Sequence, residues 1–143
     1  LEKKNIKVLK KSSYYESQSY PDITHPKYIN MVISIQCNLS LLHLMEILIS
    51  AELQLERKRK KKNDPRTCDI DIIDFNKQVI THKKNQLLIT VPHDKLDKRN
   101  FVLFPLREIC PEWKHPKTNE NIDNLINKLP IDEINSILKI IKD

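Results

Sequence analysis

The chain has 143 residues, of which 39% are apolar and 31% charged, a length and composition that suit one soluble domain with a hydrophobic core. The formal net charge is +6, which favours an anionic partner such as a nucleotide or a nucleic acid. Glycine is absent, which excludes the Gly-rich loops of P-loop enzymes and dinucleotide folds, so any phosphate site must be built from side chains.

The first part of the chain predicts two strands joined by an exposed loop. Residues 2–10 mix charges with isolated apolar residues, a pattern typical of the tail of a helix. Residues 12–17 and 28–37 are rich in aromatic and β-branched residues, and apolar residues occupy every second position from 31 to 37, as in a strand. The intervening residues 18–27 contain two prolines and an aspartate, which indicates a loop.

A helix is predicted over residues 41–56, because leucines, isoleucines and methionine recur there at helical spacing and Ser40 can cap its N-terminus. Six consecutive basic residues follow at 57–62. Like charges at this density repel one another, so we expect a mobile loop.

The middle of the chain predicts a hairpin. Residues 68–75 alternate aspartate with isoleucine, residues 76–77 supply a turn, and an apolar run resumes at 79–80. A further apolar run over residues 87–91 ends at Pro92.

The last third predicts helices over residues 99–109, 121–128 and 131–141, with a kink or a boundary at Pro105. Strands followed by helices in this order predict an α+β fold in which an antiparallel sheet is covered by helices. We find no internal repeat and expect a single domain over residues 1–143.

Targeting and redox signals are weak. The longest apolar stretch, residues 39–49, is shorter than the roughly 20 residues that a membrane span needs. Cys37, Cys68 and Cys110 lack C-x-x-C spacing, so neither a disulfide framework nor a thiolate zinc site is indicated. We expect a cytoplasmic protein with no membrane contact.

Asp69 and Asp71 are the first candidates for chemistry. In a strand, residues two apart project from the same face, so the two carboxylates would converge. A hard cation such as Mg²⁺, completed by phosphate oxygens and water, is the usual compensation for such a pair. The alternative is an amphipathic edge strand, with Asp in solvent and Ile70 and Ile72 in the core.

Basic residues that could bind a polyphosphate surround this pair in the sequence. Arginine binds phosphate in a bidentate manner, and Arg57, Arg59 and Arg66 precede the acids. His93 and Arg99 follow the predicted strand over residues 87–91 and could add phosphate donors. The alternative interpretation is solvated charge and a structural histidine.

Tyr28, Asn30 and Phe101 are candidates for binding a planar ligand, because aromatic rings stack on heterocycles and an amide offers a donor and an acceptor together. The alternative is that the two aromatic residues belong to the core and that the asparagine is a polar residue at the end of a strand. Trp113 is expected to pack at a loop, and His25, His43, His82 and His115 show no metal-ligand spacing.

Taken in order, several segments resemble the 6-hydroxymethyl-7,8-dihydropterin pyrophosphokinase family of folate biosynthesis. They are Ser13-Tyr14-Tyr15-Glu16-Ser17, Tyr28-Ile29-Asn30, Pro65-Arg66-Thr67-Cys68-Asp69-Ile70-Asp71-Ile72, Val91-Pro92-His93, and Arg99-Asn100-Phe101-Val102-Leu103-Phe104-Pro105-Leu106. The resemblance covers residues 10–130. Members of the family begin with a strand and a long helix, so the resemblance implies that this chain starts inside that helix and is N-terminally incomplete.

The resemblance implies a ferredoxin-like α+β fold and the transfer of diphosphate from ATP to the hydroxymethyl oxygen of the pterin, with release of AMP. It implies that Asp69 and Asp71 hold two Mg²⁺ ions. The other implied roles are contact with ATP for Glu52, Arg59, Arg66, His93 and Arg99, closure of a catalytic loop for Arg57 and Arg66, and pterin binding for Tyr28, Asn30 and Phe101. We then expect a monomer with small-molecule substrates and no nucleic acid partner.

Two other hypotheses stay open from the sequence. The basic run at 57–62 and the net charge of +6 are also typical of a small nucleic-acid-binding module. The expected loss of the first strand would also fit an inactive remnant of the enzyme.

Overall fold

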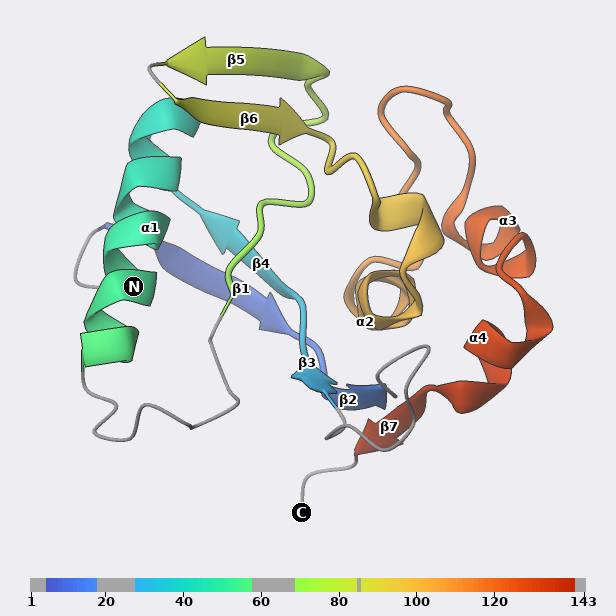
Figure 1. Ribbon diagram of the computed structural model, residues 1–143. Helices are drawn as coiled ribbons and strands as arrows, with labels where there is room; N and C mark the ends of the chain where they lie inside the picture. The colour runs from blue at the N-terminus through green and yellow to red at the C-terminus, as the bar shows by residue number, and fades with distance from the viewer. Residues whose placement is uncertain (1–4, 18–27, 58–68, 85, 141–143) are drawn as a thin grey trace. The chain divides into compact units, whose positions relative to one another are not determined.

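The computed structural model describes residues 5–17, 28–57, 69–84 and 86–140, and the chain divides into two compact units. Residues 39–93 form one of them, which we call the inserted unit, and residues 1–38 and 94–143 together form the flanking unit. Each unit combines helices with antiparallel strands (Figure 1). The predicted α+β class is therefore confirmed.

The flanking unit contains two small antiparallel sheets. They consist of β1 (Lys7–Lys11) with β4 (Ile33–Gln36), and of β2 (Tyr14–Ser17) between β3 (Tyr28–Asn30) and β7 (Leu138–Ile140). Between the two sheets the Ser12 N–H donates to the Val32 carbonyl at 2.9 Å, and the Val32 N–H donates to Ser12 Oγ at 2.9 Å. Because a serine side chain takes the place of a ladder bond here, the strand predicted over 28–37 is divided into β3 and β4.

The flanking unit also contains helices α2 (Asn100–Ile109), α3 (Ile122–Asn127) and α4 (Ile131–Ser136). The apolar face of α2 is buried, and α2 packs against α3 and β2. Pro105 lies inside α2, so of the kink or boundary predicted there the boundary is wrong. The proline lacks only one helical N–H, and the buried side chains around it, such as Leu103 and Leu106, keep the helix continuous.

The inserted unit consists of α1 (Leu41–Arg57), a hairpin of β5 (Ile80–Lys84) and β6 (Leu87–Val91), and an irregular segment over residues 69–79. Ser40 caps α1 as predicted, because its Oγ accepts a hydrogen bond from the His43 N–H at 3.2 Å. The buried residues of this unit lie on one face of α1, in the hairpin and in the irregular segment; they include Leu41, Leu44, Leu48, Ile72, Ile89 and Val91.

Three expected elements differ from the structure. Residues 7–11 were expected in a helix tail, but they form β1, because β4 offers a ladder that the local sequence does not reveal. The helix predicted over 131–141 ends at Ser136, and Leu138–Ile140 pairs with β2 as β7. The strand predicted over 68–75 is also wrong, because its described residues 69–75 form no ladder. The loops expected at 18–27 and 58–62 lie outside the described residues.

Within the described part of the chain, the strands form three separate antiparallel sheets. No helix there is both long and apolar enough to cross a membrane.

Candidate active site

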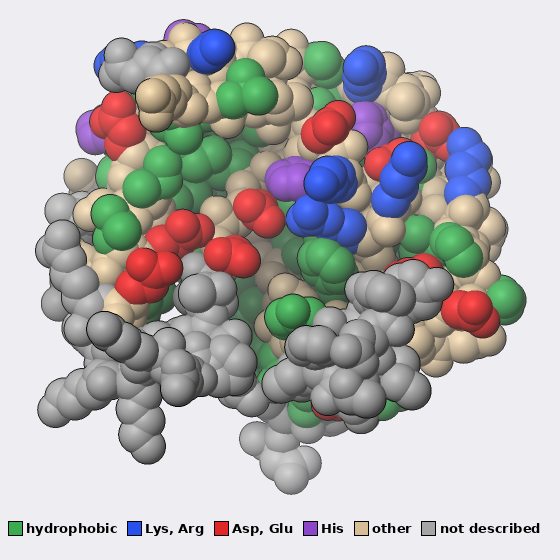
Figure 2. All heavy atoms as spheres, in the orientation of Figure 1, with side chains coloured by type: hydrophobic (Ala, Val, Ile, Leu, Met, Phe, Trp, Pro, Cys, Tyr) green, Lys and Arg blue, Asp and Glu red, His purple; other side chains and the backbone are tan. Residues whose placement is uncertain are grey.

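The segment of residues 69–74, which we call the acid segment, presents the two candidate carboxylates. Asp69 and Asp71 are exposed, whereas Ile70 is half-buried and Ile72 is buried. This alternation has the predicted period of two, although the segment belongs to no sheet in the described residues. Acidic side chains gather over α1 and this segment in the space-filling view (Figure 2). The exposure of both acids agrees with the amphipathic alternative given for this segment, whereas the predicted strand pairing is wrong.

Hydrogen bonds near both of its ends attach the acid segment to the rest of the inserted unit. Glu52 of α1 accepts a hydrogen bond from the Ile70 N–H through Oε1, at 2.5 Å. The Ile73 carbonyl accepts a hydrogen bond from the His93 N–H at 2.9 Å. The acids thus lie on a stretch of chain that is fixed close to both of its ends.

A tight turn ends the acid segment. The Lys77 N–H donates to Asp74 Oδ1 at 3.2 Å, and Lys77 Nζ lies 3.3 Å from Asp74 Oδ2. Asn76 and Lys77 have positive φ values of 51° and 61°, a conformation that asparagine tolerates better than most residues. The predicted turn at 76–77 is confirmed.

His93 joins the acid pair from the end of β6. Its Nε2 lies 4.0 Å from Asp71 Oδ2, and its side chain is 23% exposed. This arrangement places an imidazole beside the carboxylates, where it can contact an anion that the acids hold through a cation. The sequence-predicted residues Glu52, Asp69, Asp71 and His93 are therefore brought together in one unit.

The donor set of this cluster fits a hard divalent cation. Mg²⁺ is commonly held by one or two carboxylates and completed by water and substrate phosphates. Asp69 and Asp71, two positions apart in the sequence, supply exposed carboxylate oxygens of this kind. Across the described ranges, no group of three or more His, Cys, Asp or Glu side chains could form a protein-only metal cage. The pair thus fits a metal that arrives with its phosphate ligand.

The remaining described site candidates belong to the flanking unit. Tyr28 and Asn30 lie at the two ends of β3, where Asn30 is paired with Tyr15 of β2. Tyr28 is 57% exposed. Arg99 precedes α2, and its guanidinium carbon lies 5.4 Å from the ring centroid of Phe101. The aromatic candidates are therefore accessible or half-buried rather than core residues.

The side-chain positions of three candidate arginines are not among the features that the structure describes. Arg57 is the last residue of α1. Arg59 and Arg66 lie outside the described residues, as does Cys68.

Trp113 is buried beside His115, and the rings of these two residues lie edge to face with their centroids 5.8 Å apart. The expected packing role of Trp113 is therefore confirmed.

Sequence reasoning missed a second polar cluster, around Glu108 of α2. This carboxylate accepts hydrogen bonds from the Ser13 N–H and from Tyr15 Oη, each at 2.7 Å, and Lys139 Nζ lies 3.5 Å away. Burial and the hydrogen bond to Glu108 raise the pKa of Tyr15. Burial alone would raise the pKa of Glu108, but hydrogen bonds from Tyr15 and Ser13 lower it. No local sequence pattern predicts this cluster, because the segments that contribute to it lie far apart in the sequence.

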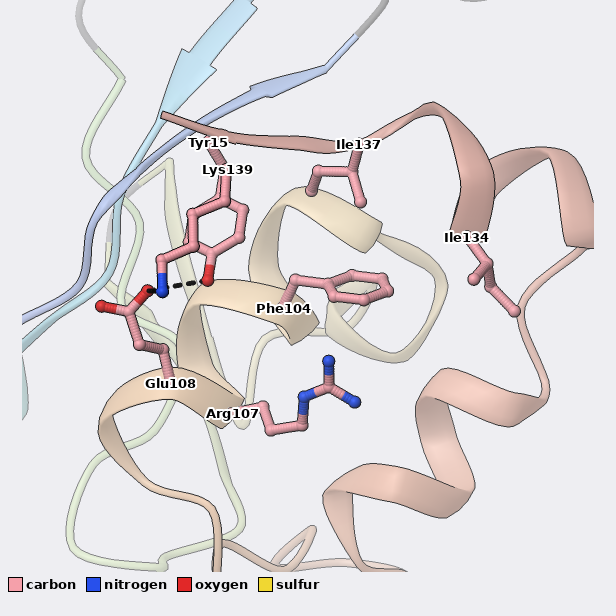
Figure 3. A pocket seen from close by; sticks show the side chains of 7 residues that line it. All are labelled: Tyr15, Phe104, Arg107, Glu108, Ile134, Ile137 and Lys139. Carbon is pink, nitrogen blue, oxygen red and sulfur yellow. Dashed lines mark hydrogen bonds and ion pairs between the residues drawn. The ribbon is translucent and has the colours of Figure 1, made fainter. Parts of the chain in front are cut away.

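The Glu108 cluster borders an open pocket of about 350 Å³ (Figure 3). Phe104, Arg107, Ile134 and Ile137 complete its lining. The charged groups of the pocket are engaged with one another or nearby: Glu108 with Tyr15 and Lys139, and Arg107 with Asp123 at 3.5 Å. We therefore interpret this cluster as a structural link between α2, β2 and β7.

Comparison with known proteins comes from a family model and from similar sequences. The model of the family described as 7,8-dihydro-6-hydroxymethylpterin-pyrophosphokinase (HPPK) matches residues 1–111. A Synechocystis protein named 2-amino-4-hydroxy-6-hydroxymethyldihydropteridine pyrophosphokinase is 34% identical over 87% of this chain and 61% of its own length. A Bacillus subtilis protein of the same name is 35% identical over 82% of this chain and 68% of its own length.

A longer relative is the folic acid synthesis protein fol1 of Pneumocystis carinii. It is 32% identical over 94% of this chain, which corresponds to 18% of the relative. This chain thus spans about three fifths of the Synechocystis protein and a small part of the fungal one.

Proposed function

Because the chain belongs to the 7,8-dihydro-6-hydroxymethylpterin-pyrophosphokinase family, we propose that it transfers diphosphate from ATP to 6-hydroxymethyl-7,8-dihydropterin in folate biosynthesis. In this reaction the hydroxymethyl oxygen of the pterin attacks the β-phosphorus of ATP, the bond between the α,β-bridging oxygen and the β-phosphorus breaks, and AMP leaves. The observation that carries the proposal is the exposed pair Asp69 and Asp71, fixed to α1 and to His93.

In this proposal Asp69 and Asp71 hold two Mg²⁺ ions. Bound Mg²⁺ neutralises the charge of the triphosphate and orients it for in-line displacement. The contribution of the protein is positional: the acid segment keeps both carboxylates on one side of the chain, away from Ile70 and Ile72. His93 lies beside Asp71, where it can contact a phosphate oxygen.

The arginines are assigned to the polyphosphate. Arg59, Arg66 and Arg99 would bind phosphate oxygens, since a guanidinium group donates two parallel hydrogen bonds to them. Arg57 and Arg66 would close a loop over the reactants, which excludes water and limits hydrolysis of ATP. Arg57 is the last residue of α1.

Tyr28, Asn30 and Phe101 are assigned to the pterin. Phe101 would stack on the ring, and Asn30 would bind its polar edge. Arg99 already lies over the ring of Phe101, so that pair offers a cation beside an aromatic surface, which suits an electron-rich heterocycle close to a phosphate.

Both units are proposed to belong to a single pyrophosphokinase domain, because the family model matches residues 1–111, a range that includes the whole inserted unit and part of the flanking unit. The free thiols of Cys37 and Cys110 suit a reducing compartment, so we place the protein in the cytoplasm. We propose that it acts as a monomer.

The proposal is tested by AMP formation from ATP and 6-hydroxymethyl-7,8-dihydropterin, with and without Mg²⁺. We expect turnover that EDTA abolishes. Asp71→Asn should lower kcat by about 100-fold or more, because a lost metal ligand removes several kcal/mol of transition-state stabilisation. Asp132→Asn, an equal change at an exposed position of α4, should leave kcat unchanged.

Two results would contradict the proposed function. One is a wild-type chain that folds, as judged by circular dichroism, and forms no AMP. The other is unchanged turnover in Asp71→Asn. Binding to RNA or DNA that needs no Mg²⁺ and weakens steeply with salt would instead favour the nucleic-acid-binding alternative.

A further inference from the structure

We propose that Glu52 is a positioning residue that holds the backbone between the two acids, so that Asp69 and Asp71 present their carboxylates together. This inference rests on the proposed function, in which the two acids are the metal ligands. It assigns Glu52 a role different from the ATP contact that the family resemblance implies.

The contact itself is short and crosses two elements. Glu52 Oε1 lies 2.5 Å from the amide nitrogen of Ile70, the residue between the acids, and the two partners are 18 positions apart in the sequence. A hydrogen bond from an N–H to a charged carboxylate is stronger than a neutral one. Because Glu52 lies inside the long helix α1, its backbone is a rigid support for this bond.

The acid segment needs such a support. In a sheet, ladder hydrogen bonds would fix the orientation of alternate side chains, but the described residues of this segment form no ladder. The Glu52 bond at Ile70 and the His93 bond at Ile73 take that function. Of the two, only the Glu52 bond acts on the peptide between the metal-binding candidates.

The burial of the surrounding residues shows which side of the acid segment faces solvent. Glu52 is half-buried, and so is Ile70, whereas Asp69 and Asp71 are exposed. Because successive side chains of an extended chain point to opposite faces, Ile70 lies on the buried face of the segment and its two acidic neighbours lie on the exposed face, and the bond to Glu52 holds the backbone in this arrangement. The same bond therefore fixes the backbone and exposes both carboxylates.

The chemistry expected of such a residue is indirect. Outer partners that orient metal ligands typically change metal affinity by about 10- to 100-fold when they are removed. A residue that contacts ATP directly would instead change nucleotide affinity and leave the acid segment in place. The two roles thus predict different measurements.

The experiment compares Glu52→Ala, Glu52→Gln and Glu46→Ala in the full chain. Glutamine keeps an oxygen that can accept the Ile70 N–H, whereas alanine does not. Glu46 is exposed on the same helix, so its substitution removes the same charge without this contact. The readouts are hydrogen exchange of the Ile70 amide, by NMR, and the Kd of Mn²⁺ measured with the α,β-methylene analogue of ATP.

We expect Glu52→Ala to speed exchange of the Ile70 amide by about tenfold or more, the equivalent of one lost charge-assisted hydrogen bond. The Kd of Mn²⁺ should rise by about 10-fold. Glu52→Gln should rescue most of both effects, and Glu46→Ala should change neither. Unchanged exchange and Mn²⁺ affinity in Glu52→Ala would overturn the inference, as would a glutamine variant as impaired as the alanine variant.

Failure of this inference is distinguishable from failure of the proposed function. If the wild-type chain forms no AMP but Glu52→Ala still releases the Ile70 amide and weakens Mn²⁺ binding, the positioning role stands and the activity does not. If the wild-type chain turns over and Glu52→Ala changes only the KM for ATP, Glu52 contacts the nucleotide and the positioning role is wrong.

Discussion

The acid segment of the inserted unit and strand β2 of the flanking unit are fixed by opposite means. β2 is hydrogen-bonded on both sides, to β3 and to β7, and it buries Tyr15 and Ser17. The acid segment forms no ladder in the described residues and is attached through Glu52 and His93, with Ile72 in the core.

The contrast between β2 and the acid segment bears on how a folded chain can expose charged side chains. A strand inside a sheet gains order from its neighbours, and its side chains are committed to packing. A segment that forms no ladder in the described residues can expose its carboxylates, and contacts such as the Glu52 bond hold its backbone in place of strand pairing. Each of the following predictions tests one half of this contrast.

The largest effect on stability is expected at the apolar anchor of the acid segment. Ile72→Ala should lower the free energy of unfolding by about 2–5 kcal/mol, because it removes a buried side chain and leaves a cavity. Urea unfolding followed by circular dichroism measures this loss. Ile29→Ala, the same change at a residue that is 50% exposed, should cost no more than about 0.5 kcal/mol. If Ile72→Ala lowers the free energy of unfolding by less than about 1 kcal/mol, the bonds to Glu52 and His93 hold the segment without the Ile72 side chain.

A smaller effect is expected from the buried hydroxyl of β2. Tyr15→Phe should lower the free energy of unfolding by about 1.5 kcal/mol, because the hydrogen bond to the ionised Glu108 is lost while the ring keeps its packing. Tyr28→Phe, at a tyrosine that is 57% exposed, is the stability control and should change it by less than about 0.5 kcal/mol. Equal stabilities of the two variants would mean that the ladders alone fix β2.

The smallest effect is a pH dependence of the same cluster. The folded-state pKa of Glu108 is lowered below its ordinary value of 4.5 by hydrogen bonds from Tyr15 and Ser13. A lowered pKa contributes stability that is present above the unfolded-state value and is lost as pH falls through the folded-state value. Thermal unfolding from about pH 6 down to about pH 3 should therefore show a steeper loss of Tm for the wild type than for Glu108→Gln. Parallel curves for the two proteins would contradict the assignment.

Several local features of this protein could be predicted from its amino-acid sequence. The Ser40 cap and the leucine spacing predicted α1, and the Asp/Ile alternation indicated, in its amphipathic interpretation, which side of residues 69–72 is exposed. These features depend on interactions within one or two turns or on the partition of apolar side chains from water, both of which can be read from neighbouring residues.

The pairing of backbone groups that are distant in the sequence could not be predicted and is seen only in the fold. Residues 7–11 and 138–140 form strands because β4 and β2 offer ladders, and short segments of lysine and apolar residues do not carry that information. The bond from Glu52 to Ile70 and the bond from Tyr15 to Glu108 join residues 18 and 93 positions apart. Such contacts depend on how the elements pack, and for that reason the support of the acid pair became visible only in the fold.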